Sequence, residues 1–274
     1  MTDPAAPSLI SLAQLSRGGP WRTELQHSRE DHLFLWITRG QGRVLVMGRR
    51  RGLGPHNALL LPARTLMSLD LGKQVYGLAV RIPGGSVPFL PTQEALHLRV
   101  RDVLVQGEAT AILDAMQREQ STHRPFGAEA ARAHAGLLSV WIRRVQAQEP
   151  PAPQPNAAQR LAEAFCSLVA RDYRSGAPMA AYATALGVTP THLTRTLRQT
   201  SGMTAADILT ERVLHGAREM LQDGDLPIRM VAESLGFSSA AYFTRFIQHH
   251  TKQTPSALRK QAHAAPLSAQ PVRA

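Results

Sequence analysis

The spacing of hydrophobic residues changes once along this chain of 274 residues. From Trp21 to about Ile82, short apolar runs are separated by Gly, Pro and Asn; they read LFLWITRG, GRVLVMG, ALLLPA and VYGLAVRIP. Such runs are typical of strands in a sandwich or barrel. From about Glu108 apolar residues recur at spacings of three and four, which indicates amphipathic helices. The pattern predicts an α+β protein with an N-terminal β-barrel, flanking helices and an all-α C-terminal part.

Two helices are predicted directly after the strands, and their role has two interpretations. The first spans Glu108–Gln120 and the second follows Phe126. We expect them to pack as antiparallel neighbours. Such a pair outside a barrel is a natural dimer surface; alternatively, it packs on its own barrel. The second helix carries a predicted apolar stripe of Ala130, Ala133, Leu137, Trp141 and Val145.

A proline-rich segment, EPPAPQPN at Glu149–Asn156, predicts the boundary between two domains. Its four prolines cannot continue a helix and favour an extended, semi-rigid spacer. We therefore expect a first domain at 1–148, a linker at 149–156, a second domain at 157–261 and a disordered tail at 262–274. Helices are predicted at Ala157–Tyr173, Met179–Leu186, Pro190–Thr200, Ala205–Gln222, Ile228–Leu235, Ser239–His250 and Pro255–Gln261.

The second domain contains an internal repeat. MAAYATALGVTPTHLTRTLRQTSGMT aligns with IRMVAESLGFSSAAYFTRFIQHHTKQT, so that Gly187 falls over Gly236. Each copy predicts a short helix, a glycine in a left-handed conformation, a Ser or Thr cap and a second helix. Thr189 is the predicted cap in the first copy, and Ser238 or Ser239 in the second. Each copy is therefore predicted to be a helix-turn-helix, whose second helix packs through Leu193 and Leu197 or through Phe243, Phe246 and Ile247.

Charge and cysteine content narrow the class of protein. The formal net charge of +11 favours a polyanionic partner such as nucleic acid. The charge is shared, however, because residues 1–155 hold 18 Arg and Lys against 12 Asp and Glu, and residues 156–274 hold 13 against 8. The single cysteine, Cys166, excludes an intrachain disulfide and is expected to be buried. No long apolar run or signal peptide is recognised, so we expect a cytoplasmic protein without membrane contact.

The tandem repeat resembles the DNA-binding domain of the AraC/XylS family of bacterial transcription regulators. The resemblance covers about Ala157–Lys260 and depends most on the GFSSAAYFTRF run, the TPSALR segment and the long helix that joins the two copies. It implies double-stranded DNA as partner. It also implies that the joining helix holds two recognition helices about 34 Å apart, so that they enter successive major grooves.

The resemblance assigns base-facing positions in the first recognition helix. They fall on Thr191, Thr194 and Arg195, with His192 nearby. Arginine can form a bidentate pair with guanine, and threonine offers a hydroxyl or a methyl group. Arg198 lies one turn further and is expected to contact a phosphate. Arg195 would otherwise be an ordinary solvated charge.

The second recognition helix is chemically poorer. Its base-facing positions fall on Ala240, Ala241 and Arg245, and alanine can contact only the thymine methyl group. Phosphate contacts are expected from Lys252, where the family usually has glycine, and from Thr254. We therefore expect the first motif to supply most of the base readout and the second to bind mainly phosphates and DNA shape.

The strand region resembles a cupin barrel, the usual N-terminal partner in this family. Metal-binding cupins need several histidines and a carboxylate around one ion. Here His27 and His32 would point to opposite faces of one strand, and His56 belongs to a predicted turn. No metal or other cofactor is therefore expected. Arg49–Arg51 in GRRRG are predicted to form an exposed hairpin turn.

An interior cavity in the barrel could still hold a small-molecule effector. The candidate wall residues are His27, Arg29, Trp36 and Arg64. For any one of them taken alone, a packing or surface role is the favoured alternative. An arginine in the wall would suit an anionic effector.

The sequence thus predicts a sequence-specific transcription regulator, not an enzyme. We expect a homodimer that responds to an effector and, if it activates transcription, contacts RNA polymerase. One alternative is a ligand-independent dimeric regulator. The other is a metal-dependent cupin enzyme fused to a DNA-binding module.

Overall fold

The computed structural model describes residues 6–72, 74–122, 124–150 and 153–264. Its N-terminal half contains two antiparallel sheets, one of five strands in the order β1-β7-β2-β5-β8 and one of three in the order β4-β3-β6. The described strands form two packed sheets and do not close into one barrel. They are β1 Ser8–Ser11, β2 His32–Arg39, β3 Gly42–Val46, β4 Arg49–Leu53, β5 Asn57–Leu61, β6 Met67–Asp70, β7 Tyr76–Ile82 and β8 Leu96–Arg99.

Strand β2 is buried on both faces, which explains why its sequence is a continuous apolar run and not an alternation of apolar and polar residues. Residues 33–37 are all buried. Phe34 and Trp36 face the helices that cover the five-stranded sheet, whereas Leu33, Leu35 and Ile37 face the core shared with the smaller sheet. Because both faces of the strand are covered, every position is apolar.

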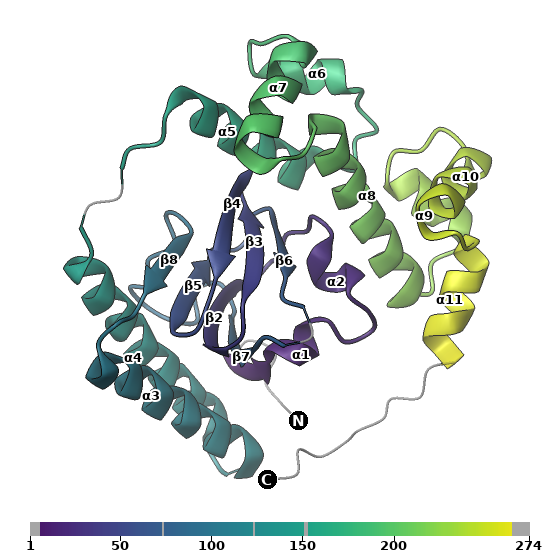
Figure 1. The fold of residues 1–274 in the computed structure, drawn as a ribbon. Coiled ribbons are helices and arrows are strands. Elements are labelled where there is room, and N and C mark those ends of the chain that lie inside the picture. Colours follow the sequence, from purple (N-terminus) through teal and green to yellow (C-terminus); the bar gives the residue numbers. More distant parts are fainter. Residues whose placement is uncertain (1–5, 73, 123, 151–152, 265–274) are drawn as a thin grey trace.

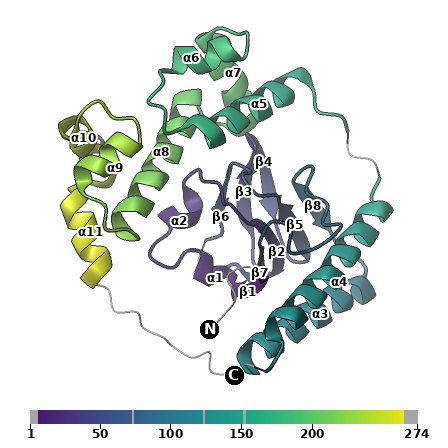
Figure 2. The ribbon, with the colours of Figure 1, turned by 180° about the vertical axis from the view of Figure 1, so that it is seen from behind.

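The helix pair that follows the strands packs on its own sheet. Helices α3 (Val103–Thr122) and α4 (Gly127–Gln148) lie side by side along the five-stranded sheet in Figures 1 and 2. Trp141 contacts Trp36 with ring centroids 5.8 Å apart and donates a hydrogen bond from Nε1 to the Val105 carbonyl at 2.9 Å. Of the two interpretations of this pair, the structure therefore shows packing on the chain's own sheet.

The apolar stripe predicted on α4 is partly wrong. Ala133 is exposed and the side chain of Leu137 is 55% exposed. The helix carries apolar residues on more than one face, so spacing alone did not identify the face that meets the sheet. The buried hydrophobic residues of α4 are Ala135, Leu138, Trp141, Ile142 and Val145.

The GRRRG segment is a strand and not the predicted exposed turn. Arg49–Leu53 form β4, which pairs with β3 in antiparallel register. The turn lies earlier, at Met47 and Gly48, where φ is 47° and 72°. Gly48 is buried against Ala162 and Cys166 of the C-terminal half. Arginines can occupy a strand because their long side chains carry the charge to solvent while the backbone pairs.

Helices are the only regular secondary structure in the described residues of the C-terminal half, in agreement with the prediction. Asn156 begins the first of these helices with a capping box, since its side chain accepts from the Gln159 N–H at 2.9 Å. The predicted tail overlaps the last helix up to Ala264, and residues 265–274 lie outside the described part. The helices are α5 Ala157–Asp172, α6 Met179–Ala185, α7 Pro190–Ser201, α8 Ala205–Gln222, α9 Ile228–Ser234, α10 Ala240–Thr251 and α11 Pro255–Ala264; the N-terminal half adds the short α1 Leu12–Leu15 and α2 Trp21–Glu24.

One core joins these C-terminal helices. Phe165 of α5, Leu193 of α7 and Phe243 of α10 are fully buried in it. Cys166 is also buried, as predicted, and burial raises the pKa of its thiol. None of the helices that the structure describes is both long and apolar enough to span a bilayer.

The two halves pack against each other along α8. Arg22 forms an ion pair with Asp223 at 2.6 Å, and the Gln26 N–H donates to the Glu211 carboxylate at 3.2 Å. The His215 ring stacks on that of His27, with centroids 4.8 Å apart and an interplanar angle of 12°. Both histidines are almost completely buried.

This histidine stack predicts a loss of stability in acid. Burial lowers the pKa of His27 to about 4 and that of His215 to about 2. Protonation is then favoured in the unfolded chain, so the stability that the neutral rings contribute is present above pH 6.5 and is lost as the pH falls towards 4. For His27 alone, the loss at pH 5 is on the order of 2 kcal/mol.

Urea unfolding at several pH values would measure this loss. His215→Phe keeps an aromatic ring in the stack but removes one titrating group. Its stability is expected to fall less than that of the wild type between pH 6.5 and 5. Parallel pH profiles for the two proteins would contradict the prediction.

Candidate nucleic-acid interface

Of the two helix-turn-helix units, one lies at the first end of α8 and the other lies beside this helix (Figures 1 and 2). The first consists of α6 and α7 and the second of α9 and α10. Gly187 and Gly236 make the two turns with φ of 67° and 76°, in the left-handed region that glycine adopts without strain. The predicted repeat of helix, glycine turn and helix is therefore confirmed.

Each recognition helix begins at a side-chain cap. The Thr189 hydroxyl accepts from the His192 N–H at 3.2 Å, and Pro190 follows at the first helical position. In the second unit Ser239, not Ser238, accepts from the Tyr242 N–H at 3.2 Å. The caps satisfy one N–H of each first turn, which leaves other donors at the helix start for an anion such as a phosphate.

The apolar residues of both recognition helices face inward. Leu193, Leu197, Phe243 and Ile247 are fully buried. Phe246 is half-buried and packs on Phe237 with ring centroids 5.2 Å apart. The prediction that these aromatic residues are core and not base-stacking groups agrees with their burial.

The polar face of α7 points to solvent. Thr191, His192, Arg195 and Arg198 are exposed, and Thr194 is half-buried. Positions separated by three, four and seven residues lie on one face of a helix. The structure thus brings the five candidate DNA contacts of the first unit together on one accessible surface.

The corresponding face of α10 has fewer polar groups. Ala241 and Arg245 are exposed and Ala240 is half-buried. The Ala240 carbonyl accepts a hydrogen bond from the Thr244 hydroxyl at 2.9 Å within the helix. Lys252 ends the helix with φ of 59° and donates from Nζ to the His249 carbonyl at 2.9 Å.

Thr254, the third phosphate candidate, is exposed at the start of α11. Its hydroxyl accepts from the Ala257 N–H at 3.1 Å. Thr254 therefore caps α11. The backbone N–H groups of the first turn of α11 follow Lys252 closely in the sequence.

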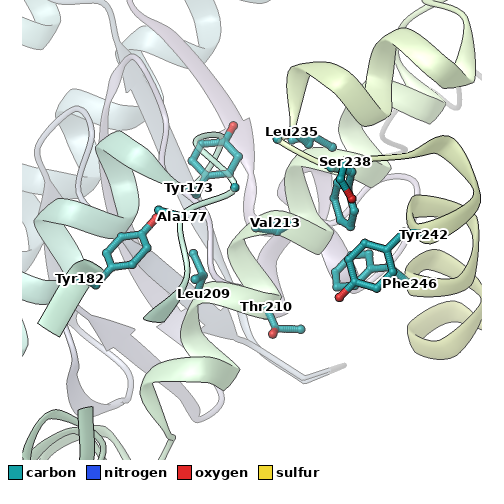
Figure 3. A pocket seen from close by; sticks show the side chains of 13 residues that line it. Tyr173, Ala177, Tyr182, Leu209, Thr210, Val213, Leu235, Ser238, Tyr242 and Phe246 are labelled. Carbon is teal, nitrogen blue, oxygen red and sulfur yellow. The ribbon is translucent and has the colours of Figure 1, made fainter. Parts of the chain in front are cut away.

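The sequence predicted the helix that joins the two units but not a second, direct contact between them. Besides α8, the turn of the second unit contacts the loop before the first, because Gly236 and Gly176 meet backbone to backbone. Beside this contact lies a cavity of about 330 Å³. Figure 3 shows that Tyr242 and Phe246 face it from α10, with Leu209 and Val213 of α8 between them and Tyr182. In the sequence, the signal for this contact is the presence of glycine at both positions, 176 and 236.

The four candidate effector residues do not surround one cavity inside the strands. Trp36 packs between β2 and α4. His27, Arg29 and Arg64 instead line a cleft between the two halves of the chain. The expectation of one barrel pocket formed by all four is wrong, because strand register separates Trp36 from the other three.

The described histidines of the N-terminal half do not converge on one point with other metal-ligating side chains. In the described ranges, no three His, Cys, Asp or Glu side chains come close enough to hold one ion. The Nδ1 atom of His32 accepts from the Ala63 N–H at 3.0 Å, and His27 Nδ1 is hydrogen-bonded to the Leu25 carbonyl at 2.9 Å.

Comparison with known proteins places this geometry in a class. Residues 182–261 match the family model of a helix-turn-helix domain. The chain is 30% identical over 182 residues to the HTH-type transcriptional regulator GlxA of Rhizobium meliloti, covering 64% of this chain and 54% of that relative. It is 26% identical to the HTH-type transcriptional activator RhaR of Shigella flexneri, covering 86% and 81%. The alignment with GlxA thus spans about half of that relative's length.

Among solved structures, ToxT from Vibrio cholerae O395 aligns over 94% of this chain and 98% of its own, with 13% identity and a TM-score of 0.45. The C-terminal domain of AraT from Geobacillus stearothermophilus aligns over 40% and 88%, with 23% identity and a TM-score of 0.35.

The C-terminal half is a helix-turn-helix domain. It is of the AraC type, so the resemblance found in the sequence is confirmed.

Lys252 yields a prediction with two effects of opposite sign. It occupies a left-handed position where the first unit has Gly202, with φ of 79°. Lys252→Gly is therefore expected to stabilise the protein by about 1 kcal/mol, because it removes the strain of a Cβ at positive φ. The same change is expected to weaken binding to all DNA sequences and to lower the salt slope of binding by about one, because a phosphate contact is lost.

Urea unfolding and DNA titrations across a range of salt concentrations would measure the two effects. Lys252→Ala is the matched control, since it loses the charge but keeps the strain. An unchanged salt slope in both variants would show that Lys252 does not bind phosphate.

Proposed function

We propose that this protein is a sequence-specific DNA-binding transcription regulator whose N-terminal half responds to a small-molecule effector. The observation that carries the proposal is the pair of helix-turn-helix units, joined by α8, with exposed polar faces on both recognition helices. RhaR, which aligns along most of the chain, is named as a transcriptional activator, and this supports the same interpretation.

The two recognition helices have different roles in this proposal. Helix α7 reads bases, with Arg195 on guanine and Thr191, His192 and Thr194 on neighbouring positions. Helix α10 contributes Arg245 and the small surface of Ala240 and Ala241. Its role is mainly to bind phosphates and DNA shape, together with Arg198, Lys252 and Thr254.

Regulation acts through the contact between the halves. The N-terminal half touches α8, which holds both recognition helices, and Gly202 at the end of α7 lies against Arg50 of β4. A ligand that binds one arrangement of the halves better than another shifts the population of DNA-binding geometries.

A homodimer is part of the proposal. The outer face of α4 exposes Leu137 by 55% and Val140 by 40%, and apolar groups on one exposed helix face suit a partner helix. RNA polymerase is the further partner if the protein activates transcription.

Selection of DNA ligands from a random pool by the purified full chain tests the proposal. The expected product is a motif with two blocks about 10 base pairs apart, since one monomer would enter successive major grooves. Binding to that motif should exceed non-specific binding by about 10³ or more. Failure to enrich any sequence would refute the assignment.

A further inference from the structure

A cleft of about 760 Å³ lies between the two halves of the chain. Its N-terminal wall includes His27 and Arg29 from the segment before β2. Its C-terminal wall includes Arg174 after α5 and Arg212 on α8. The volume is in the range of small-molecule sites, which are commonly found where two domains meet.

Arg212 is the most unusual group in this cleft. Its side chain is buried, yet Nε and Nη1 find no hydrogen-bond partner in the part of the chain that the structure describes. The guanidinium lies 3.7 Å from the centre of the Tyr173 ring, and Nη2 donates a long hydrogen bond of 3.5 Å to the Ser28 hydroxyl. Burial lowers the pKa of Arg212, which reports the cost of removing this charge from water. A buried guanidinium is stabilised by an anion, and the described residues supply none in contact with it.

Arg29, on the opposite wall of the cleft, also has a guanidinium group with an unsatisfied N–H. It is half-buried, its Nε has no hydrogen-bond partner among the described residues, and burial lowers its pKa. The neighbouring carboxylates are engaged elsewhere, because Asp31 pairs with Arg81 at 3.1 Å and Glu30 with Arg64 at 3.2 Å. Asp31 still raises the pKa of Arg29, and the exposed Glu219 raises the pKa of both Arg29 and Arg212.

The charges in the cleft therefore do not balance. Among the charged residues that line the cleft, Arg64 pairs with Glu30, Arg171 pairs with Asp172, and Asp31 pairs with Arg81, which lies outside the lining. Arg29, Arg174 and Arg212 then face one further acid of the lining, Glu219. Arginine binds planar oxyanions through two parallel hydrogen bonds, so this set of donors suits a carboxylate or a phosphate.

We infer that the cleft between the two halves binds a small organic anion, held by its carboxylate or phosphate between Arg29 and Arg212. This site replaces the pocket expected inside the strands and rests on the proposed function for its regulatory meaning. Because the anion contacts one arginine from each half, it stabilises the arrangement in which the halves are packed along α8.

Isothermal titration calorimetry on the full chain without DNA tests this inference. Inorganic phosphate and succinate serve as separate probes, at ionic strength held constant with sodium chloride. One equivalent of at least one probe is expected to bind, and the preferred probe distinguishes a phosphate site from a carboxylate site. In Arg29→Gln the affinity should fall at least about tenfold, because a charge-assisted hydrogen bond is lost.

Arg144→Gln is the matched control, since Arg144 is exposed on α4, away from the cleft, and its loss should leave affinity unchanged. Arg212→Gln should weaken binding as well; if it does not fold, Arg29→Gln decides alone. The inference is overturned if neither probe binds at millimolar concentration, or if Arg29→Gln binds as tightly as Arg144→Gln. Because no DNA is present, this failure would leave DNA binding untouched, and a failure to select DNA would leave anion binding intact.

Discussion

Replacement of Gly236 by alanine is expected to cost about 2–5 kcal/mol of stability. The residue has φ of 76°, and a Cβ there would lie 2.7 Å from the Arg174 carbonyl oxygen and would also overlap the backbone of Gly176. The left-handed conformation alone costs a non-glycine residue about 1–2 kcal/mol. Overpacking against backbone that cannot move adds about 1–3 kcal/mol.

Gly187 provides the matched control within the same molecule. It occupies the equivalent turn of the first unit with φ of 67°, but a Cβ there meets no atom within 4 Å. Gly187→Ala should therefore cost only the conformational part, about 1–2 kcal/mol.

Urea unfolding of the full chain would measure both losses, and DNA affinity would show whether the second unit is displaced. If both substitutions cost the same, the contact between Gly236 and Gly176 contributes nothing to the joining of the units.

Arg195→Ala is expected to change DNA selectivity more than any other single substitution on α7. The side chain is exposed at the centre of the polar face, in reach of a base edge. Loss of one bidentate pair to guanine costs about 1–3 kcal/mol and relaxes discrimination at that base pair. Fluorescence anisotropy with the selected motif and its single-base variants would measure the change.

Arg198→Ala, one turn further along the same exposed face, is the control for a loss of charge alone. As a phosphate contact it should weaken every sequence by a similar factor and lower the salt slope. If Arg195→Ala also weakened all sequences equally, the assignment of Arg195 to base readout would be wrong.

The helix-turn-helix units could be predicted closely because their determinants are local. Gly187 and Thr189 fix the first turn within three residues, and Gly236 and Ser239 fix the second. The joining helix was predicted with the bounds that the structure shows, Ala205–Gln222. Glycine conformation, capping and helical period act over a few residues, so a single sequence contains the information.

The N-terminal half was less predictable because its partners are distant in sequence. Strands β1 and β8 are four-residue segments that gain their pairing from β7 and β5. The face of α4 that is buried depends on which side meets the sheet. Trp36 was grouped with Arg29 because both looked like pocket residues, but strand register placed the tryptophan beneath α4.

The sequence by itself determined the class of this protein: an α+β chain with two helix-turn-helix units, their turns, their caps and the exposed residues of each recognition helix. These features follow from short-range backbone preferences and from the helical period. Tertiary structure alone decided that Gly176 and Gly236 meet, that His27 stacks on His215, and that arginines from both halves converge on one cleft. Those contacts join residues that are far apart along the chain, and they depend on how whole elements pack, which local preferences do not encode.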